Sequence, residues 1–65
     1  MKKRFFVEIE YADKSLFNFN VELEGSTGNI LATLMMITRG TLMASMGNKA
    51  TAYNEDGFDV VSYIK

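Results

Sequence analysis

Apolar and polar residues alternate along two stretches near the start of the chain, Lys3 to Tyr11 and Leu16 to Glu24. Alternation with a period of two is typical of strands that bury one face. The polar residues 12–15 between the stretches are turn formers, so the two stretches are predicted to pair as a β-hairpin. The residues on its apolar side are Phe5, Val7, Ile9, Tyr11, Phe17, Phe19, Val21 and Leu23.

The longest apolar stretch, Asn29 to Met46, has the periodicity of a helix and carries one charge, Arg39. Residues 25–28 before it offer hydroxyl groups as N-caps, and residues 47–48 after it supply a residue with positive φ to end the helix. Gly40 leaves two interpretations open. It either ends one short helix before a second, or lies inside a continuous helix at a cost of about 1 kcal/mol. The apolar periodicity keeps its phase through Gly40 and favours the continuous helix.

Two further strands are predicted after the helix. Lys49 to Asn54 is a weak strand, with two alanines on one side, and Phe58 to Ile64 is rich in β-forming residues. Residues 54–57 between them form a strong turn signal. The order β-β-α-β-β over residues 1–65 predicts one small α+β domain, an antiparallel sheet with one long helix packed on one face.

The two periodicities also predict the core, with the register of the last strand left open. On the helix, we expect the side that faces the sheet to carry Ile30, Leu31, Leu34, Met35, Thr38 and Leu42. Met46 is expected near the same side as ordinary core. The expected core cluster is Phe5, Val7, Ile9, Phe17, Phe19, Val21, Leu31, Leu34, Leu42 and Val60, with either Ser62 or Val61.

The far side of the helix has almost no charge, although a helix on the surface of a small domain normally has a charged face. A chain of this length buries only about 60% of its unfolded surface, and this one lacks both cysteine and histidine. Oligomerisation is then the simplest additional stabilisation. Met36, Gly40, Met43 and Ala44 share the far side, and the two small residues allow another backbone to approach closely. We therefore expect a homodimer with these four residues at the interface.

Three polar segments have the composition of ligand sites, and each has a simpler interpretation. Residues 25–28 precede a helix, as anion-binding loops do, but lack the P-loop lysine. Residues 54–59 are too short for a calcium loop. Four glutamates share the polar side of the hairpin, where a solvated face is simpler than a cation site or a surface for a basic partner. They are Glu8, Glu10, Glu22 and Glu24. We expect no cofactor, no metal and no enzymatic activity.

The net charge of −1 lacks the basic footprint of a nucleic-acid-binding protein. The alternative function is nonetheless a nucleic-acid-associated accessory protein of phage or mobile-element origin, with basic residues on phosphates and an aromatic residue stacked on bases. Its candidate contacts are Lys2, Lys3, Arg4, Arg39 and Lys49, with Phe6 or Tyr63 for stacking. The acidic side of the hairpin opposes this alternative.

Nothing in the sequence predicts secretion or a membrane span. The basic residues 2–4 resemble the start of a signal peptide, but Glu8 and Glu10 interrupt the apolar run that follows. The helix is shorter than the ~20 apolar residues of a membrane span and has Arg39 near its middle. We expect a cytoplasmic protein.

Residues 38–43 (TRGTLM) and 53–60 (YNEDGFDV) resemble short uncharacterised proteins of gut Bacteroides-type bacteria and their mobile elements. The resemblance covers most of the chain and carries no motif of known chemistry. It implies a small cytoplasmic bacterial protein and transfers no site residues. The hypothesis from the sequence is a small self-associating protein-interaction module, in which the helix forms the dimer contact and the sheet face or the hairpin meets a partner.

Overall fold

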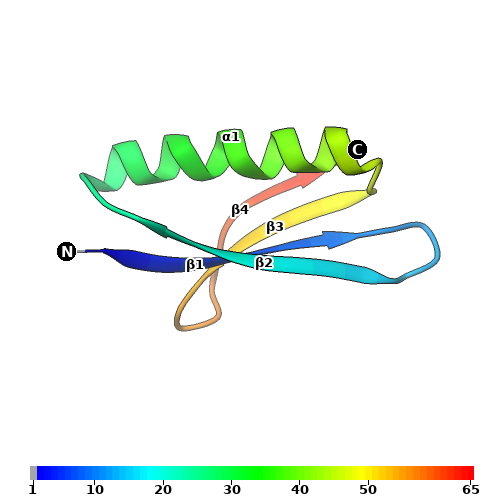
Figure 1. The fold of residues 1–65 in the computed structure, drawn as a ribbon, viewed down its shortest axis with the longest axis horizontal. Helices are drawn as coiled ribbons and strands as arrows, with labels where there is room; N and C mark the ends of the chain where they lie inside the picture. The colour runs from blue at the N-terminus through cyan, green and yellow to red at the C-terminus, as the bar shows by residue number, and fades with distance from the viewer. Residues whose placement is uncertain (1) are drawn as a thin grey trace.

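The computed structural model describes residues 2–65 and contains the predicted succession of elements. They are β1 (Lys3–Glu10), β2 (Leu16–Leu23), α1 (Thr27–Ser45), β3 (Lys49–Asn54) and β4 (Asp59–Ile64). The strands form one antiparallel sheet in the order β2-β1-β3-β4, and α1 lies across one face of it (Figure 1). The predicted α+β class and the order β-β-α-β-β are confirmed.

The β1–β2 hairpin pairs apolar residues with apolar residues. Val7 lies opposite Phe19 and Ile9 opposite Phe17, so the apolar sides of both strands face α1. Its turn closes through Asp13, whose Oδ1 accepts hydrogen bonds from the backbone N of Ser15 at 3.0 Å and from its Oγ at 2.6 Å. The register therefore follows from the alternation in the sequence and from this turn.

The helix α1 is continuous through Gly40, as the unbroken periodicity predicted. Ser26 is its N-cap, and the hydroxyl oxygen accepts a hydrogen bond from the backbone N of Asn29 at 3.3 Å. The left-handed residue at its C-terminus is Met46, with φ 61°, rather than Gly47. Gly47 has a different role, because a Cβ there would collide with Ile9 Cγ2. The glycine lets the chain pass close to β1.

The core lies between α1 and the two central strands. Its buried residues are Phe5, Val7, Ile9, Ile30, Leu34, Leu42, Ala50 and Ala52. Ala50 and Ala52 are fully buried, because short side chains on β3 let the helix pack closely. Thr38 is buried too, and its Oγ1 donates a hydrogen bond to the Leu34 carbonyl oxygen at 2.7 Å, which satisfies the hydroxyl.

Four residues expected in or near the core are exposed instead. Their exposed fractions are 51% for Phe17, 39% for Leu31, 43% for Met35 and 78% for Met46. The expectation was wrong because it assumed that the helix covers the whole sheet. The helix α1 packs mainly on β3 and β4 and less on β1, so the side of the core next to β2 stays open.

The last strand owes its register to a β-bulge. Ala52 lies opposite Val61 and Tyr53 opposite Asp59, so Val60 is the extra residue between them. Val60 and Val61 are both half-buried against the core, whereas Ser62 is exposed. Of the two alternatives for the core, Val61 is therefore correct. A bulge of this kind cannot be recognised from the alternation alone.

Candidate interaction surface

The side of α1 that faces away from the sheet is apolar and uncovered. Met36 and Met43 are 75% and 64% exposed, and we call these two residues the crest of the helix. A Cβ at Gly40 would meet no atom within 4 Å, and Ala44 is exposed. All four residues predicted for the interface thus lie on the accessible surface of one helix. At about 100° per residue, Gly40 and Ala44 lie on one flank of the crest.

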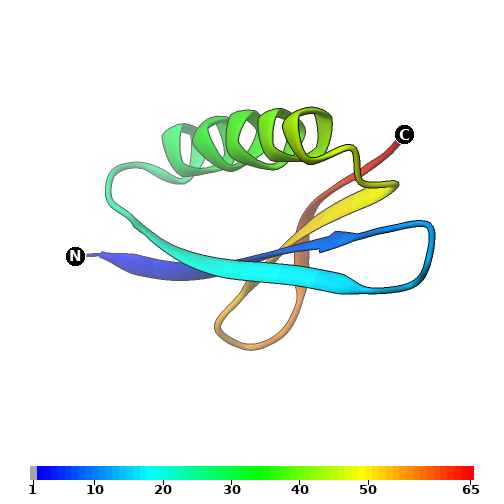
Figure 2. The same ribbon diagram turned by 45° about the vertical axis from the view of Figure 1, so that its right-hand side comes forward.

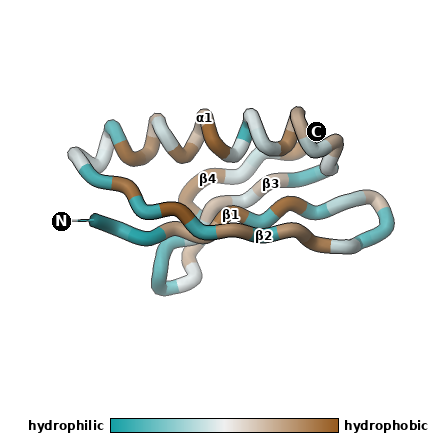
Figure 3. Tube along the Cα trace, viewed as in Figure 1, coloured by the Kyte–Doolittle hydropathy of each residue, from teal (hydrophilic) through white to brown (hydrophobic). Residues whose placement is uncertain are grey.

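The opposite flank of α1 carries Leu31, Met35 and Met46, all partly or largely exposed. Leu31 lines the same hollow as Val60 of β4 and residues 54–56 of the β3–β4 turn, so this flank begins on the β4 side of the sheet. Met46 borders a shallow depression together with Tyr11, Ala12, Asp13 and Ser15 of the β1–β2 turn. The crest and this flank together form an apolar arc, interrupted only by the charge of Arg39. Figure 3 shows that apolar and near-neutral residues dominate α1 along its whole length.

A second apolar surface lies on β2, on the face turned toward α1. It consists of Phe17, Phe19, Val21 and Leu23, and we call it the β2 shelf. Phe17 is half exposed and the other three are half-buried. The rings of Phe17 and Phe19 lie 5.9 Å apart between centroids and are tilted by 45°. The sequence identified these four residues as one face but predicted three of them as core, because nothing local indicates where the helix lies.

The width of the sheet explains why the β2 shelf is open. Four strands about 4.8 Å apart make a sheet about 19 Å wide, whereas a helix with its side chains is about 10 Å wide. One helix therefore cannot cover the whole sheet, and α1 packs on β3 and β4 and less on β1, so β2 stays open. The turn of the β1–β2 hairpin also projects beyond the C-terminal end of α1 (Figure 2).

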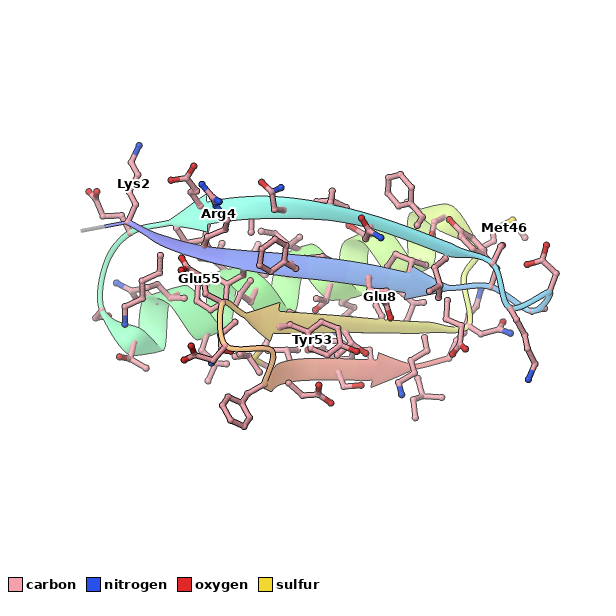
Figure 4. The ribbon with its side chains drawn as sticks, turned by 90° about the horizontal axis from the view of Figure 1, so that it is seen from below. Lys2, Arg4, Glu8, Met46, Tyr53 and Glu55 are labelled. Atoms are coloured by element: carbon pink, nitrogen blue, oxygen red, sulfur yellow. The ribbon has the colours of Figure 1, made fainter. Side chains whose placement is uncertain are left out.

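The opposite face of the sheet is polar, with two neighbouring aromatic residues in its centre. Phe6 is 40% exposed and lies opposite Tyr53. Burial raises the pKa of the Tyr53 hydroxyl, and the nearby carboxylates of Glu8 and Asp59 raise it further. Glu8 and Tyr53 lie on adjacent strands in Figure 4, which views the sheet from the face opposite α1. An acidic neighbourhood of this kind repels phosphate groups.

The residues proposed for contacts to nucleic acid do not gather on this face. Tyr63 lies opposite the buried Ala50, so it faces α1, whereas Phe6 points to the other side of the sheet. Arg4 Nη2 lies 3.9 Å from Glu22 Oε1, and both side chains are exposed to solvent. The predicted glutamates Glu8, Glu10 and Glu22 belong to β1 and β2 and share the polar face, and Glu24 follows the end of β2.

A hollow of about 790 Å³ opens beneath the first turns of α1. Its apolar floor includes Phe5, Ile30 and Val60, and its mouth carries both basic residues at 2–4 and acidic residues at 55–56. The backbone N of residue 4 donates a hydrogen bond to the carboxylate of residue 55 at 3.3 Å, which joins the two sides. Figure 4 shows the charged groups at this end of the sheet, opposite the end that carries Met46. The mixed charge selects neither anions nor cations.

The remaining polar segments have structural roles. The Asn54 Oδ1 accepts hydrogen bonds from the backbone N of Asp56 and of Phe58, each at 3.0 Å, so this side chain closes the β3–β4 turn. Within residues 2–65, no cluster of three or more acidic side chains has the geometry to hold a metal ion. In the same part of the chain, no helix has the combination of length and apolar character that a membrane span requires.

Comparisons with protein-family models, with curated proteins and with solved structures found no match for the chain. The candidate interaction site therefore comes from two exposed apolar surfaces. They are the crest of α1 with its flank, and the β2 shelf.

Proposed function

We propose that this protein is a small self-associating protein-interaction module whose dimer contact includes Met36, Gly40, Met43 and Ala44. The observation that carries this proposal is the exposure of the crest, where Met36 and Met43 are 75% and 64% accessible on a helix with one charge. Soluble monomers rarely expose large contiguous apolar patches, and such patches usually mark contacts with other molecules. A symmetric pair is the commonest way for one chain to cover its own patch.

The chemistry of the four residues suits a contact between proteins. Methionine side chains are flexible and polarizable, so they adapt to the surface that they meet. Gly40 and Ala44 add little bulk and let a partner approach the backbone of α1. The long stem of Arg39 can cover apolar surface while its guanidinium stays in water. The polar face or the hairpin is left free for a second protein, and the non-enzymatic role and the cytoplasmic location expected from the sequence belong to this proposal.

The mass in solution tests the proposal. We expect light scattering at about 10–100 μM, where contacts of micromolar affinity form, to give about twice the monomer mass of 7.3 kDa. Met36→Glu should shift the protein to monomer, because the contact would bury an unpaired carboxylate. Asn18→Glu, which adds the same charge on the exposed polar face of β2, is the matched control and should stay dimeric. A wild-type mass near 7.3 kDa over this range would refute the proposal.

The nucleic-acid alternative receives less support. Its stacking residues Phe6 and Tyr63 lie on opposite faces of the sheet. Phe6 lies instead opposite Tyr53, whose pKa the carboxylates of Glu8 and Asp59 raise. Phosphate contacts supply most of the affinity of non-specific nucleic-acid binding, and these carboxylates oppose them. Association with another protein chain is therefore the function that the surfaces support best.

A further inference from the structure

We infer that in the dimer α1 of each copy packs on the β2 shelf of the other copy. We call this reciprocal packing the exchange. This inference deepens the proposed function and rests on it. It assigns an interface role to Phe17, Phe19, Val21 and Leu23, and places the crest of α1 against a sheet rather than against a second helix. Two helices would then lie side by side between two sheets.

The β2 shelf is the part of the sheet that α1 does not cover. Along β1 the residues that face α1 are almost fully buried, at 6% exposure for Phe5 and 0% for Val7 and Ile9. On β2, one strand further out, Phe17 is 51% exposed and its neighbours along the shelf are half-buried. The uncovered strip is therefore one strand wide, about 5 Å, and lies at the edge of the sheet. A second helix beside α1 would fill it.

The crest of α1 is an apolar surface that no sheet covers. The crest of α1 is apolar in the manner of a helix with a sheet on both sides, although α1 has a sheet on only one. Each copy thus has two uncovered apolar surfaces, the crest of α1 and the β2 shelf. In a two-fold symmetric dimer, the crest of each copy can pack on the shelf of the other, which gives an isologous contact. A contact of crest against crest would instead leave Phe17 in water.

The area agrees with a stable dimer. The four large residues that this contact would cover are Phe17, Met36, Met43 and Met46, with exposed fractions from 51% to 78%. With about 200 Å² for each large side chain when fully exposed, they contribute roughly 540 Å² per copy. Two copies would then bury roughly 1,100 Å² through these side chains alone, above the roughly 1,000 Å² that a specific interface needs.

Charge does not oppose this arrangement. The β2 shelf has no charged residue, and α1 brings only Arg39, which lies between the crest and the flank that carries Leu31 and Met35. A guanidinium at this place can lie over the exposed ring of Phe17 or extend past the rim of the shelf into water. Like charges therefore do not meet across the two-fold axis.

Cysteine cross-linking tests the arrangement, because the natural chain contains no cysteine. Three variants are prepared, Met36→Cys on the crest, Phe17→Cys on the shelf and Asn20→Cys on the opposite face of the same strand. Each is treated alone and in pairwise mixtures with a short bismaleimide, and mass spectrometry identifies the products. We expect the mixture of Met36→Cys with Phe17→Cys to give at least about ten times more cross-linked dimer than any single variant or the mixture of Met36→Cys with Asn20→Cys, since only the first pair meets at close range.

The other outcomes separate this inference from the proposed function. Efficient cross-linking of Met36→Cys alone would show a contact of helix with helix, which keeps the dimer and overturns the exchange. Efficient cross-linking of Asn20→Cys alone would show that the β2 edges of two copies pair, which also keeps the dimer and overturns the exchange. A dimeric wild type without any of these products would also overturn the exchange. A monomeric wild type would overturn both.

A charge on the shelf gives a second, independent readout. Phe17→Glu should raise the dimer dissociation constant at least about tenfold in sedimentation, because the carboxylate would lie beneath the partner helix. Asn20→Glu on the solvent face of β2 is the matched control and should leave the constant unchanged. Circular dichroism of both variants checks the fold, and Phe17 is exposed enough for its replacement to leave the core intact. An unchanged constant for a folded Phe17→Glu would contradict the exchange.

Discussion

Gly47 is required because neighbouring atoms leave no room for a Cβ, and not because its backbone angles demand a glycine. A Cβ at this position would collide with Ile9 Cγ2, and it would lie 3.3 Å from the Glu10 carbonyl oxygen. The first atom belongs to a fully buried side chain and the second to the backbone of β1, so neither can move away easily. The sequence marked this glycine as a helix terminator, and the structure shows that it is a packing contact.

We therefore predict that Gly47→Ala destabilises the fold by about 1–3 kcal/mol, as extra volume does in a well-packed core. Gly28→Ala is the matched control. It lies in the first turn of α1, where a Cβ meets no atom within 4 Å, and should stabilise the fold by up to about 1 kcal/mol. Urea unfolding of both variants measures the difference. Equal stability of the two would show that the loop moves away from Ile9 without cost.

Tyr53 is the second residue with a specific prediction. Burial raises its pKa above the ordinary value of 10.0, and the carboxylate of Glu8 contributes next. The folded state then holds the hydroxyl proton more tightly than the unfolded state, so stability is full below pH 10.0 and falls as the pH rises through the raised pKa. Glu8→Gln should lower the pKa of Tyr53 only in part, because burial is the larger cause.

Ultraviolet titration of the phenolate follows this pKa, with Tyr53→Phe to assign the signal. Urea unfolding above pH 10.0 gives the corresponding loss of stability, which should be smaller in Tyr53→Phe. A Tyr53 that titrates at its ordinary pKa would show that its ring is more exposed than the structure places it.

At the scale of elements, the sheet has a covered side and an open side. Leu34 of α1 is fully buried, whereas Phe19 of β2 is only half-buried although both were predicted as core. The difference comes from the lateral position of the helix over β3 and β4. Stability and association should therefore depend on different elements, with the α1–β1–β3 contact important for the fold and β2 available to a partner.

We predict that Leu34→Ala costs about 3–5 kcal/mol, close to the whole stability of a domain of this size. Phe19→Ala should cost less in the monomeric state, about 1–3 kcal/mol, because part of its ring is already in water. Urea unfolding monitored by circular dichroism, in the Met36→Glu background to remove association, measures both. A larger loss for Phe19→Ala would place the helix over β2 instead.

At the scale of the whole molecule, the proposed association and the stability of the fold are coupled. A chain of 65 residues has a small core, which rarely supplies more than ~3–5 kcal/mol. Binding a second copy stabilises the folded state by mass action. The apolar surface left open by one copy would then be part of how the fold reaches a useful stability.

The melting temperature should accordingly rise with protein concentration, by several degrees for a hundredfold increase, because more of the folded chain is dimeric. Met36→Glu should remove this dependence and melt at the lower temperature at every concentration. Differential scanning calorimetry over the accessible range measures it. A wild-type melting temperature independent of concentration would contradict a dimer that forms together with the fold.

Local chemistry was enough to determine the elements of this protein. The alternation in β1 and β2, the hydroxyl N-cap at Ser26 and the turn at residues 54–57 each act within a few neighbouring residues, so the sequence contains the whole signal. The same holds for the continuity of α1 through Gly40 and for the exposed methionines of its far side. Periodicity alone was thus enough to predict that Met36 and Met43 face away from the sheet.

The positions of these elements relative to one another depend on the tertiary structure. The displacement of α1 toward β3 and β4, which exposes Phe17, Leu31 and Met35, depends on contacts between residues far apart in the chain. So do the bulge that places Val61 in the core and the contact that requires Gly47. Periodicity specifies which face of an element is apolar but not which neighbour covers it, because burial depends on the width of the sheet and on the small volumes of Ala50 and Ala52.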